Sequence, residues 1–181
     1  MSPSAHPWQK AAINPEMGVA VYEPKIVANI IKNSKNPILV IGAMSLRWKV
    51  GDELLIDVLV RLAKAANIPI VATAHTHKHI LNKKDADLKV IVSPLVNLTN
   101  RLEDDSGWPG FDEKGKPDLI IYGGITTYYL SQMLSTLKNF TDRLQTLTLD
   151  PEFQPNARFS LGNVNQDEWK KFLEELIASF Q

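Results

Sequence analysis

Short apolar segments that alternate with amphipathic segments constrain the fold of this chain more than any other feature. The clearest are Ile38–Ile41, which ends at Gly42, and Leu119–Tyr122, which ends at Gly123. Short runs of branched apolar residues are typical of strands that are buried on both faces. Strands that alternate with amphipathic helices form a parallel sheet with helices on both faces. The sequence therefore predicts an α/β protein with a Rossmann-like parallel sheet.

The same pattern predicts the individual elements. We expect strands at 38–42, 68–73, 89–92, 118–124 and 143–149, and helices at 24–35, 51–66, 95–102, 126–140 and 166–180. Polar and apolar residues alternate in the strand at 143–149, which favours a strand at the edge of the sheet. Asn165 and Glu168 have the spacing of a capping box at the start of the last helix.

The length of 181 residues, 44% of them hydrophobic, is enough for one α/β domain over residues 1–181. Residues 1–21 are predicted to be an extended N-terminal arm, because their prolines block a long helix. Large apolar side chains are scattered along this arm. The arm can therefore pack on its own domain or on a partner.

The composition disfavours several classes of function. Lys and Arg together number 20, as do Asp and Glu, and this balance argues against a general nucleic-acid or anionic-membrane binder. No apolar run approaches the ~20 residues of a membrane span. The chain has no cysteine, which excludes disulfides, a catalytic thiol and any iron–sulfur cluster held by this chain alone. No secretory pattern opens the sequence, so we expect a cytoplasmic protein.

Parallel sheets bind ligands outside the carboxyl ends of their strands, where the strand order reverses. This rule nominates the loops 42–50, 73–86, 123–127 and 150–165. In the first loop we expect Gly42, Ala43, Ser45 and Arg47 to bind a nucleotide cofactor, because amides at a helix start hold phosphate. The usual glycine-rich fingerprint and phosphate-loop lysine are both absent. An ordinary strand-to-helix turn is the alternative.

The second glycine junction is Gly123-Gly124-Ile125-Thr126. Paired glycines leave room for a flat ring or a phosphate, so Gly123, Gly124 and Thr126 complete the predicted cofactor-binding set. The alternative for Thr126 is to cap the helix that follows.

Three histidines alternate in the sequence at His75, His77 and His79. In an extended segment all three imidazoles would point to one side, which suits zinc or nickel. Against this, no carboxylate lies within the segment and Lys78 adds a like charge. We therefore predict solvated histidines and no metal site, and a zinc or nickel site is the alternative.

The sequence contains no recognisable catalytic constellation, and no catalytic residue is predicted. A long loop at 103–117 carries Trp108 and Phe111, which indicates either a functional loop or an excursion whose aromatics fold back onto the domain.

The order of three segments resembles a known family. The segments are 36–43 (NPILVIGA), 117–124 (PDLIIYGG) and 149–157 (LDPEFQPNA). In this order, and in total length, the chain resembles the epsilon subunit of the archaeal acetyl-CoA decarbonylase/synthase complex. The resemblance implies a fold of the NAD/FAD-binding-domain class, like that of deoxyhypusine synthase.

The resemblance also implies a role. The chain would be a non-catalytic subunit that stabilises the alpha subunit, which is the nickel–iron–sulfur carbon monoxide dehydrogenase. A further implied role is to assist electron transfer to FAD, which makes FAD the candidate cofactor. Candidates for aromatic anchors at a partner interface are Trp8, Trp48, Trp108 and Phe111. Alternatives are a stand-alone flavin- or nicotinamide-nucleotide-binding domain and a free-standing enzyme for a small metabolite. Self-association stays open, with a homo-oligomer as one alternative.

Overall fold

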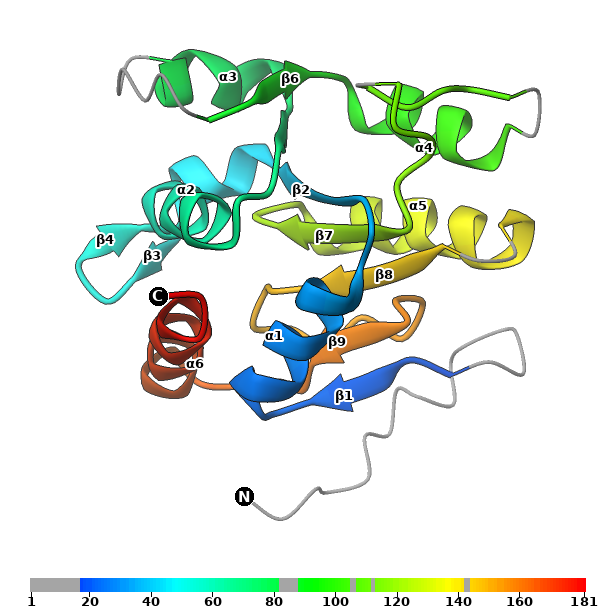
Figure 1. Ribbon diagram of the computed structural model, residues 1–181. Helices are drawn as coiled ribbons and strands as arrows, with labels where there is room; N and C mark the ends of the chain where they lie inside the picture. Colours follow the sequence, from blue (N-terminus) through cyan, green and yellow to red (C-terminus); the bar gives the residue numbers. More distant parts are fainter. Residues whose placement is uncertain (1–16, 82–87, 105–106, 112, 142–143) are drawn as a thin grey trace.

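A seven-stranded parallel sheet forms the centre of the protein in the computed structural model, which describes residues 17–81, 88–104, 107–111, 113–141 and 144–181. Its strands lie in the order β1-β9-β8-β7-β2-β5-β6 (Figure 1). They are β1 (Val19–Val21), β2 (Pro37–Ile41), β5 (Ile70–Ala72), β6 (Val90–Val92), β7 (Leu119–Gly123), β8 (Gln145–Thr148) and β9 (Phe159–Leu161). A separate two-stranded hairpin consists of β3 (Lys49–Val50) and β4 (Glu53–Leu54).

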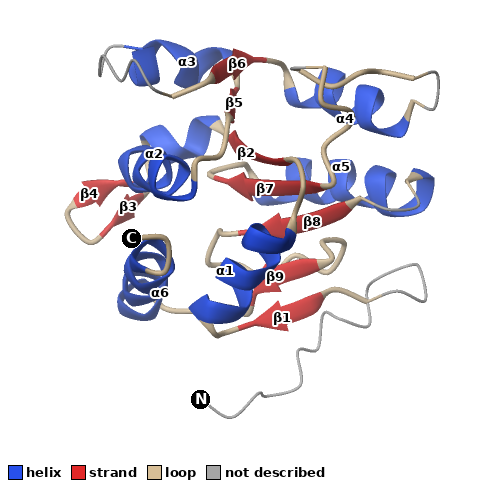
Figure 2. Cartoon of the chain, in the orientation of Figure 1, coloured by secondary structure: helices blue, strands red, loops and turns tan. Residues whose placement is uncertain are grey.

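Helices cover both faces of the sheet, which confirms the predicted layer arrangement (Figure 2). The helices are α1 (Pro24–Asn33), α2 (Leu55–Ala66), α3 (Ala74–Leu81), α4 (Leu95–Glu103), α5 (Thr127–Phe140) and α6 (Gln166–Ala178). One apolar cluster joins α1, α2 and α6 to one face, and a second joins α4 and α5 to the other. Alternate residues of β2 divide between the clusters, with Leu39 in the first and Val40 in the second.

Strand β8 lies inside the sheet, so the predicted edge position of 143–149 is wrong. It pairs with β7 on one side and β9 on the other. Its two threonines are buried, and each has a partner: the Thr148 hydroxyl donates to the Ser160 hydroxyl at 2.7 Å, and the Thr146 hydroxyl accepts from the Arg158 amide at 2.9 Å. Satisfied hydroxyls allow a strand with period-two polarity to occupy an interior position.

Helix α2 begins at Leu55, four residues after the predicted start. Gly51, with φ of 63°, and Asp52 instead form the turn of the β3–β4 hairpin. Glu53 lies in β4 and pairs with Arg61 at 2.8 Å.

At the other end of the chain, the predicted capping box is confirmed: the Glu168 amide donates to Asn165 Oδ1, and the Asn165 amide donates to Glu168 Oε2.

Part of the predicted arm is a strand. Residues 19–21 form β1, which pairs with β9 at one edge of the sheet, while residues 1–16 lie outside the described part of the chain. The assignment to the NAD/FAD-binding-domain class stays a prediction. None of the helices in the described part of the chain is both long enough and apolar enough to cross a membrane.

Strands β2 and β7 are tied together at their amino ends by one carboxylate. Asp118 accepts hydrogen bonds from the Ser34 hydroxyl at 2.5 Å and from the amides of Lys35 and Asn36, both at 2.8 Å. Burial raises the pKa of Asp118, but these hydrogen bonds outweigh it and hold the pKa below its ordinary value. Asp118 therefore sets the register of the two strands whose opposite ends carry the predicted site.

Candidate functional site

The strand order reverses between β2 and β7, and the two predicted glycine junctions meet there. From β2 the chain continues to β5 and β6 on one side, whereas β7 is followed by β8 and β9 on the other. The Gly42 amide donates to the Gly123 carbonyl and the Met44 amide donates to the Gly124 carbonyl, both at 2.9 Å. The structure thus brings together residues that are about eighty positions apart, at the edge where such sheets bind ligands.

The glycines allow these two backbones to touch. A Cβ on Gly42 would lie 2.4 Å from the Gly124 carbonyl oxygen and 2.4 Å from Ile125 Cγ1. Gly124 has a φ of 70°, and a Cβ there would lie 2.5 Å from Ser45 Cβ. The space beside both glycines is therefore filled by the protein itself, and the paired junctions form a closed contact.

The other predicted residues around this contact have separate environments. Residues 43–46 form a short 3₁₀ helix, η2 (Ala43–Leu46), in which the buried Ser45 hydroxyl donates to the Gly42 carbonyl at 2.6 Å. Ala43 and Arg47 are exposed. Thr126 is the N-cap residue of α5, but its side chain makes no capping hydrogen bond. Nucleotide binding by this set stays a prediction.

Asp150 is the polar residue that organises this edge, and it is not among the site residues predicted from the sequence. It lies two residues beyond β8 and is 4% exposed. Its Oδ1 accepts from the Gly124 amide at 2.7 Å, and its Oδ2 accepts from the Ile125 amide at 3.4 Å. The carboxylate therefore takes two backbone amides that could otherwise hold a phosphate. A single acid directly after the predicted strand at 143–149 was the available signal.

Burial raises the pKa of Asp150 to about 7. The hydrogen bonds from Gly124 and Ile125 act in the opposite direction, and the nearby Glu152 raises the pKa further. Desolvation disfavours the charged carboxylate more than two amide donors stabilise it. This acid consequently changes its charge near neutral pH.

A cavity of about 630 Å³ opens beside this contact, between the β3–β4 hairpin, the segment after β8 and the start of α6. Of the predicted cofactor-binding residues, Arg47 is the one that lines it. The lining carries charges of both signs and two indoles: Arg47, Trp48, Lys49, Gly51, Pro151, Glu152, Gln166, Asp167, Trp169 and Lys170. The Trp169 indole N–H donates to the Leu149 carbonyl at 2.7 Å, which fixes α6 against the end of β8.

The histidine segment is helical, so it lacks the extended geometry that would point all three imidazoles to one side. Residues 74–81 form α3, where His75 and His79 share one side and His77 lies on another. His79 Nε2 lies 3.2 Å from Asp57 Oδ1 of α2. Among the residues that the structure describes, no three His, Asp or Glu side chains gather as potential metal ligands.

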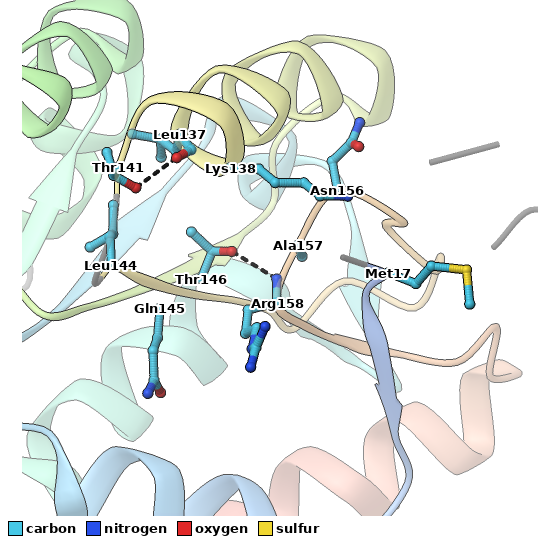
Figure 3. A pocket seen from close by; sticks show the side chains of 10 residues that line it. All are labelled: Met17, Leu137, Lys138, Thr141, Leu144, Gln145, Thr146, Asn156, Ala157 and Arg158. Atoms are coloured by element: carbon cyan, nitrogen blue, oxygen red, sulfur yellow. Dashed lines mark hydrogen bonds between the residues drawn. The ribbon is translucent and has the colours of Figure 1, made fainter. Parts of the chain in front are cut away.

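A second cavity, of about 350 Å³, lies at the opposite edge of the sheet, between the end of α5 and the starts of β8 and β9 (Figure 3). The Thr141 hydroxyl donates to the Leu137 carbonyl at 2.6 Å on one side of it. The side chains of Lys138 and Arg158 contribute positive charge to its lining. This cavity is remote from the strand reversal, and no predicted site residue lines it.

Three of the four predicted anchor aromatics pack on the domain itself. Trp48 lies against the first apolar cluster, and Trp108 and Phe111 lie against the second, with their ring centroids 4.9 Å apart in an edge-to-face contact. This is the alternative in which the loop aromatics fold back. The fourth, Trp8, lies outside the described residues.

Comparison with known proteins identifies close relatives. A model of the family described as "CO dehydrogenase beta subunit/acetyl-CoA synthase epsilon subunit" matches residues 2–177. The chain is 32% identical over 172 residues to a protein of Methanothermobacter thermautotrophicus named acetyl-CoA decarbonylase/synthase complex subunit epsilon, covering 95% of this chain and 94% of the relative. It is 34% identical over 177 residues to subunit epsilon 1 of Archaeoglobus fulgidus, covering 97% and 92%. It is 33% identical over 180 residues to subunit epsilon of Methanothrix soehngenii, covering 97% and 91%.

Replacing Gly124 tests the closed junction. Gly124→Ala is expected to lower the free energy of unfolding by about 2–4 kcal/mol, because the new methyl group meets Ser45 at a left-handed backbone position. Gly107→Ala is the matched control, since Gly107 has a φ of 88° but nothing within 4 Å of an added Cβ. It should lose only about 1 kcal/mol. Equal losses in urea unfolding would contradict a filled junction.

The raised pKa of Asp150 predicts a pH-dependent stability. Between its ordinary pKa of 3.8 and about 7, the folded chain holds a proton that the unfolded chain has released. The stabilisation that this group contributes is therefore complete below pH 4 and is lost as the pH rises through 7. Above that pH the group causes no further change in the free energy of unfolding. Between pH 5 and pH 8 the free energy of unfolding of the wild type should fall by about 2 kcal/mol relative to Asp150→Asn. The control Glu175→Gln, at an exposed position on α6, should keep the wild-type dependence of the free energy of unfolding on pH. If Asp150→Asn also kept that dependence, the raised pKa of Asp150 would be refuted.

Proposed function

This chain belongs to the CO dehydrogenase beta subunit/acetyl-CoA synthase epsilon subunit family, and we propose that it is an accessory subunit of an acetyl-CoA decarbonylase/synthase complex. The single observation that carries this proposal is the family match over residues 2–177. Relatives that align over nearly their whole length are themselves named as epsilon subunits of such a complex. The chain thus works with other subunits.

The partner that we propose is the alpha subunit, the nickel–iron–sulfur carbon monoxide dehydrogenase, and the role is to stabilise it. Iron–sulfur clusters are held by cysteine thiolates, and these 181 residues contain no cysteine. The metal chemistry therefore belongs to another chain. A protein that binds only the folded form of its partner stabilises that form by mass action. The epsilon-type chain itself carries out no step of the reaction.

Purification from the native host tests this role. The affinity-tagged chain should retain a large subunit together with nickel and iron, measured by mass spectrometry and elemental analysis. The isolated chain should not oxidise carbon monoxide. Adding it to the purified large subunit should lengthen the half-life of carbon monoxide oxidation on heating. A chain that purifies alone and leaves that half-life unchanged would sink the proposal.

A second candidate function is to bind FAD and to help pass electrons to it. The observation that favours it is the 630 Å³ cavity, which is in the size range of cofactor sites and carries Arg47, Lys49 and Lys170. These cations would face the pyrophosphate, because Asp150 occupies the amides of the glycine junction. The indole of Trp48 lines the same cavity. FAD, when bound, would accept electrons from the clusters of the partner.

Titration with FAD tests this second role directly. Flavin fluorescence should change saturably at micromolar FAD, and a double variant, Arg47→Gln with Lys49→Gln, should weaken the interaction at least ~10-fold because two phosphate-facing charges are lost. Lys171→Gln on the outer side of α6 is the control and should bind as the wild type does. Without a saturable change up to high micromolar FAD, this candidate is abandoned.

A further inference from the structure

The outer side of helix α5 carries no charge. Its exposed residues are Tyr128, Gln132, Asn139 and Phe140. Lys138 is the single charged residue in these fourteen positions, and it is half-buried and lines the cavity at the amino edge of the sheet. A helix face that is exposed to water over four turns is expected to carry several charged side chains.

The other α-helices in the described part of the chain follow that expectation. Helix α6 has the most charges: Lys170 lies 4.0 Å from Glu174, and Lys171 lies 3.9 Å from Glu175, both as i,i+4 pairs typical of a solvated face. Each of the remaining helices exposes at least one charged side chain, namely Lys25 on α1, Arg61 on α2, Lys78 on α3 and Arg101 on α4. The lack of charge on α5 is thus specific to this helix.

Large apolar rings take the place of charges on α5. Tyr128 is 74% exposed and Phe140 is 69% exposed, which makes them the most exposed large hydrophobic residues in the described chain. They are twelve positions apart, or ~18 Å along the helix axis. Successive steps of three or four residues place Gln132, Thr136 and Asn139 between them, along a row that winds about 120° around the helix. We call these five residues the α5 stripe.

This composition matches the core of a protein–protein interface. Such cores are depleted in Lys, Glu and Asp and enriched in aromatic residues, because a charge that loses its water costs more than its contacts return. Exposed tyrosine is also a frequent source of binding energy at interfaces. Single exposed apolar residues elsewhere, such as Ile26 and Leu81, need no such explanation.

The neighbouring helix extends the same surface. Helices α4 and α5 lie side by side on one face of the sheet (Figure 1). Exposed residues of α4 include Val96, Asn97 and Asn100, which are uncharged. Its one exposed charge, Arg101, lies over the ring of Trp108 at 5.8 Å. The opposite face, with α1, α2 and α6, has the charged surface of a solvated protein.

We propose that the α5 stripe, together with the adjoining part of α4, is the surface that docks onto the catalytic subunit of the complex. The inference rests on the proposed function, because membership of a complex with other subunits is what favours a different chain over a second copy of this one. The matching surface on the partner must also be uncharged and must offer apolar recesses for Tyr128 and Phe140.

Charge insertion into the stripe tests this assignment in the assembled complex. Gln132→Lys and Gln132→Glu each place one charge within the stripe, and Tyr128→Ala with Phe140→Ala removes both rings. Binding of each purified variant to the nickel–iron–sulfur subunit is measured by surface plasmon resonance. Each variant should raise the dissociation constant at least ~30-fold, which is the loss of affinity typical of changes at the centre of an interface. Ala178→Lys is the matched control, because it adds a charge to an exposed position on α6, and it should bind as the wild type does.

The outcomes separate this inference from the proposed function. If the wild-type chain does not bind the subunit, the proposed function fails. If it binds and the stripe variants bind equally well, the docking surface lies elsewhere and the inference alone is overturned. If either Gln132→Lys or Gln132→Glu binds more tightly than the wild type, the inference that the partner surface is uncharged is overturned. A change in self-association without loss of partner binding would assign the stripe to a second copy. Unchanged thermal midpoints for all variants exclude misfolding, since these positions are exposed.

Discussion

The backbone contact between the ends of β2 and β7 is the constraint on which this edge of the structure depends. At the point where strand order reverses, other proteins of this architecture leave a crevice for a ligand. Here the Gly42 amide reaches the Gly123 carbonyl at 2.9 Å, and no side chain fits between the two junctions. Asp118 holds the same two strands at their amino ends. The pair is therefore tied at both ends, which makes it a rigid centre for the sheet.

Asp150 gives this rigid centre a sensitivity to pH. A carboxylate from the segment after β8 takes the place of an external anion as the partner of the Gly124 and Ile125 amides. Its burial raises its pKa to about 7, so the junction is held by a group that is partly protonated near neutrality. The closed junction leaves no room for a ligand beside Gly42 and Gly124. The space at this edge is the neighbouring cavity, whose lining includes charged side chains and two indoles.

The two faces of the molecule are suited to different surroundings. The face covered by α6 has regularly spaced ion pairs, which water screens and solvates. The face covered by α4 and α5 exposes amides, hydroxyls and two aromatic rings. The chain belongs to a family of complex subunits, and a subunit needs a surface that contacts its partners. The α5 stripe has the composition of that surface.

Sequence alone determined the layer architecture, because apolar periodicity reports directly which side of an element is buried. It located the central strands, placed most helices within a few residues, identified the capping box at Asn165 and carried the family resemblance. It also selected Gly42 and Gly124, but as cofactor-binding residues, because a glycine after a buried strand permits a tight turn and the close approach of a ligand. Local pattern was less informative where a partner from another segment decided the outcome.

Only the tertiary structure decided which polar groups from distant segments become partners. The hydroxyl partners on and beside β9 made β8 an interior strand. Helix α3 turned the alternating histidines to different sides and paired His79 with Asp57 of α2. Asp150 became a buried group because the end of β8 lies against the β7 junction, a proximity that no local spacing encodes. The uncharged side of α5 became visible only when the sheet showed which of its residues face water. Periodicity records the burial of each element, whereas the partners of a polar group depend on how distant segments are brought together.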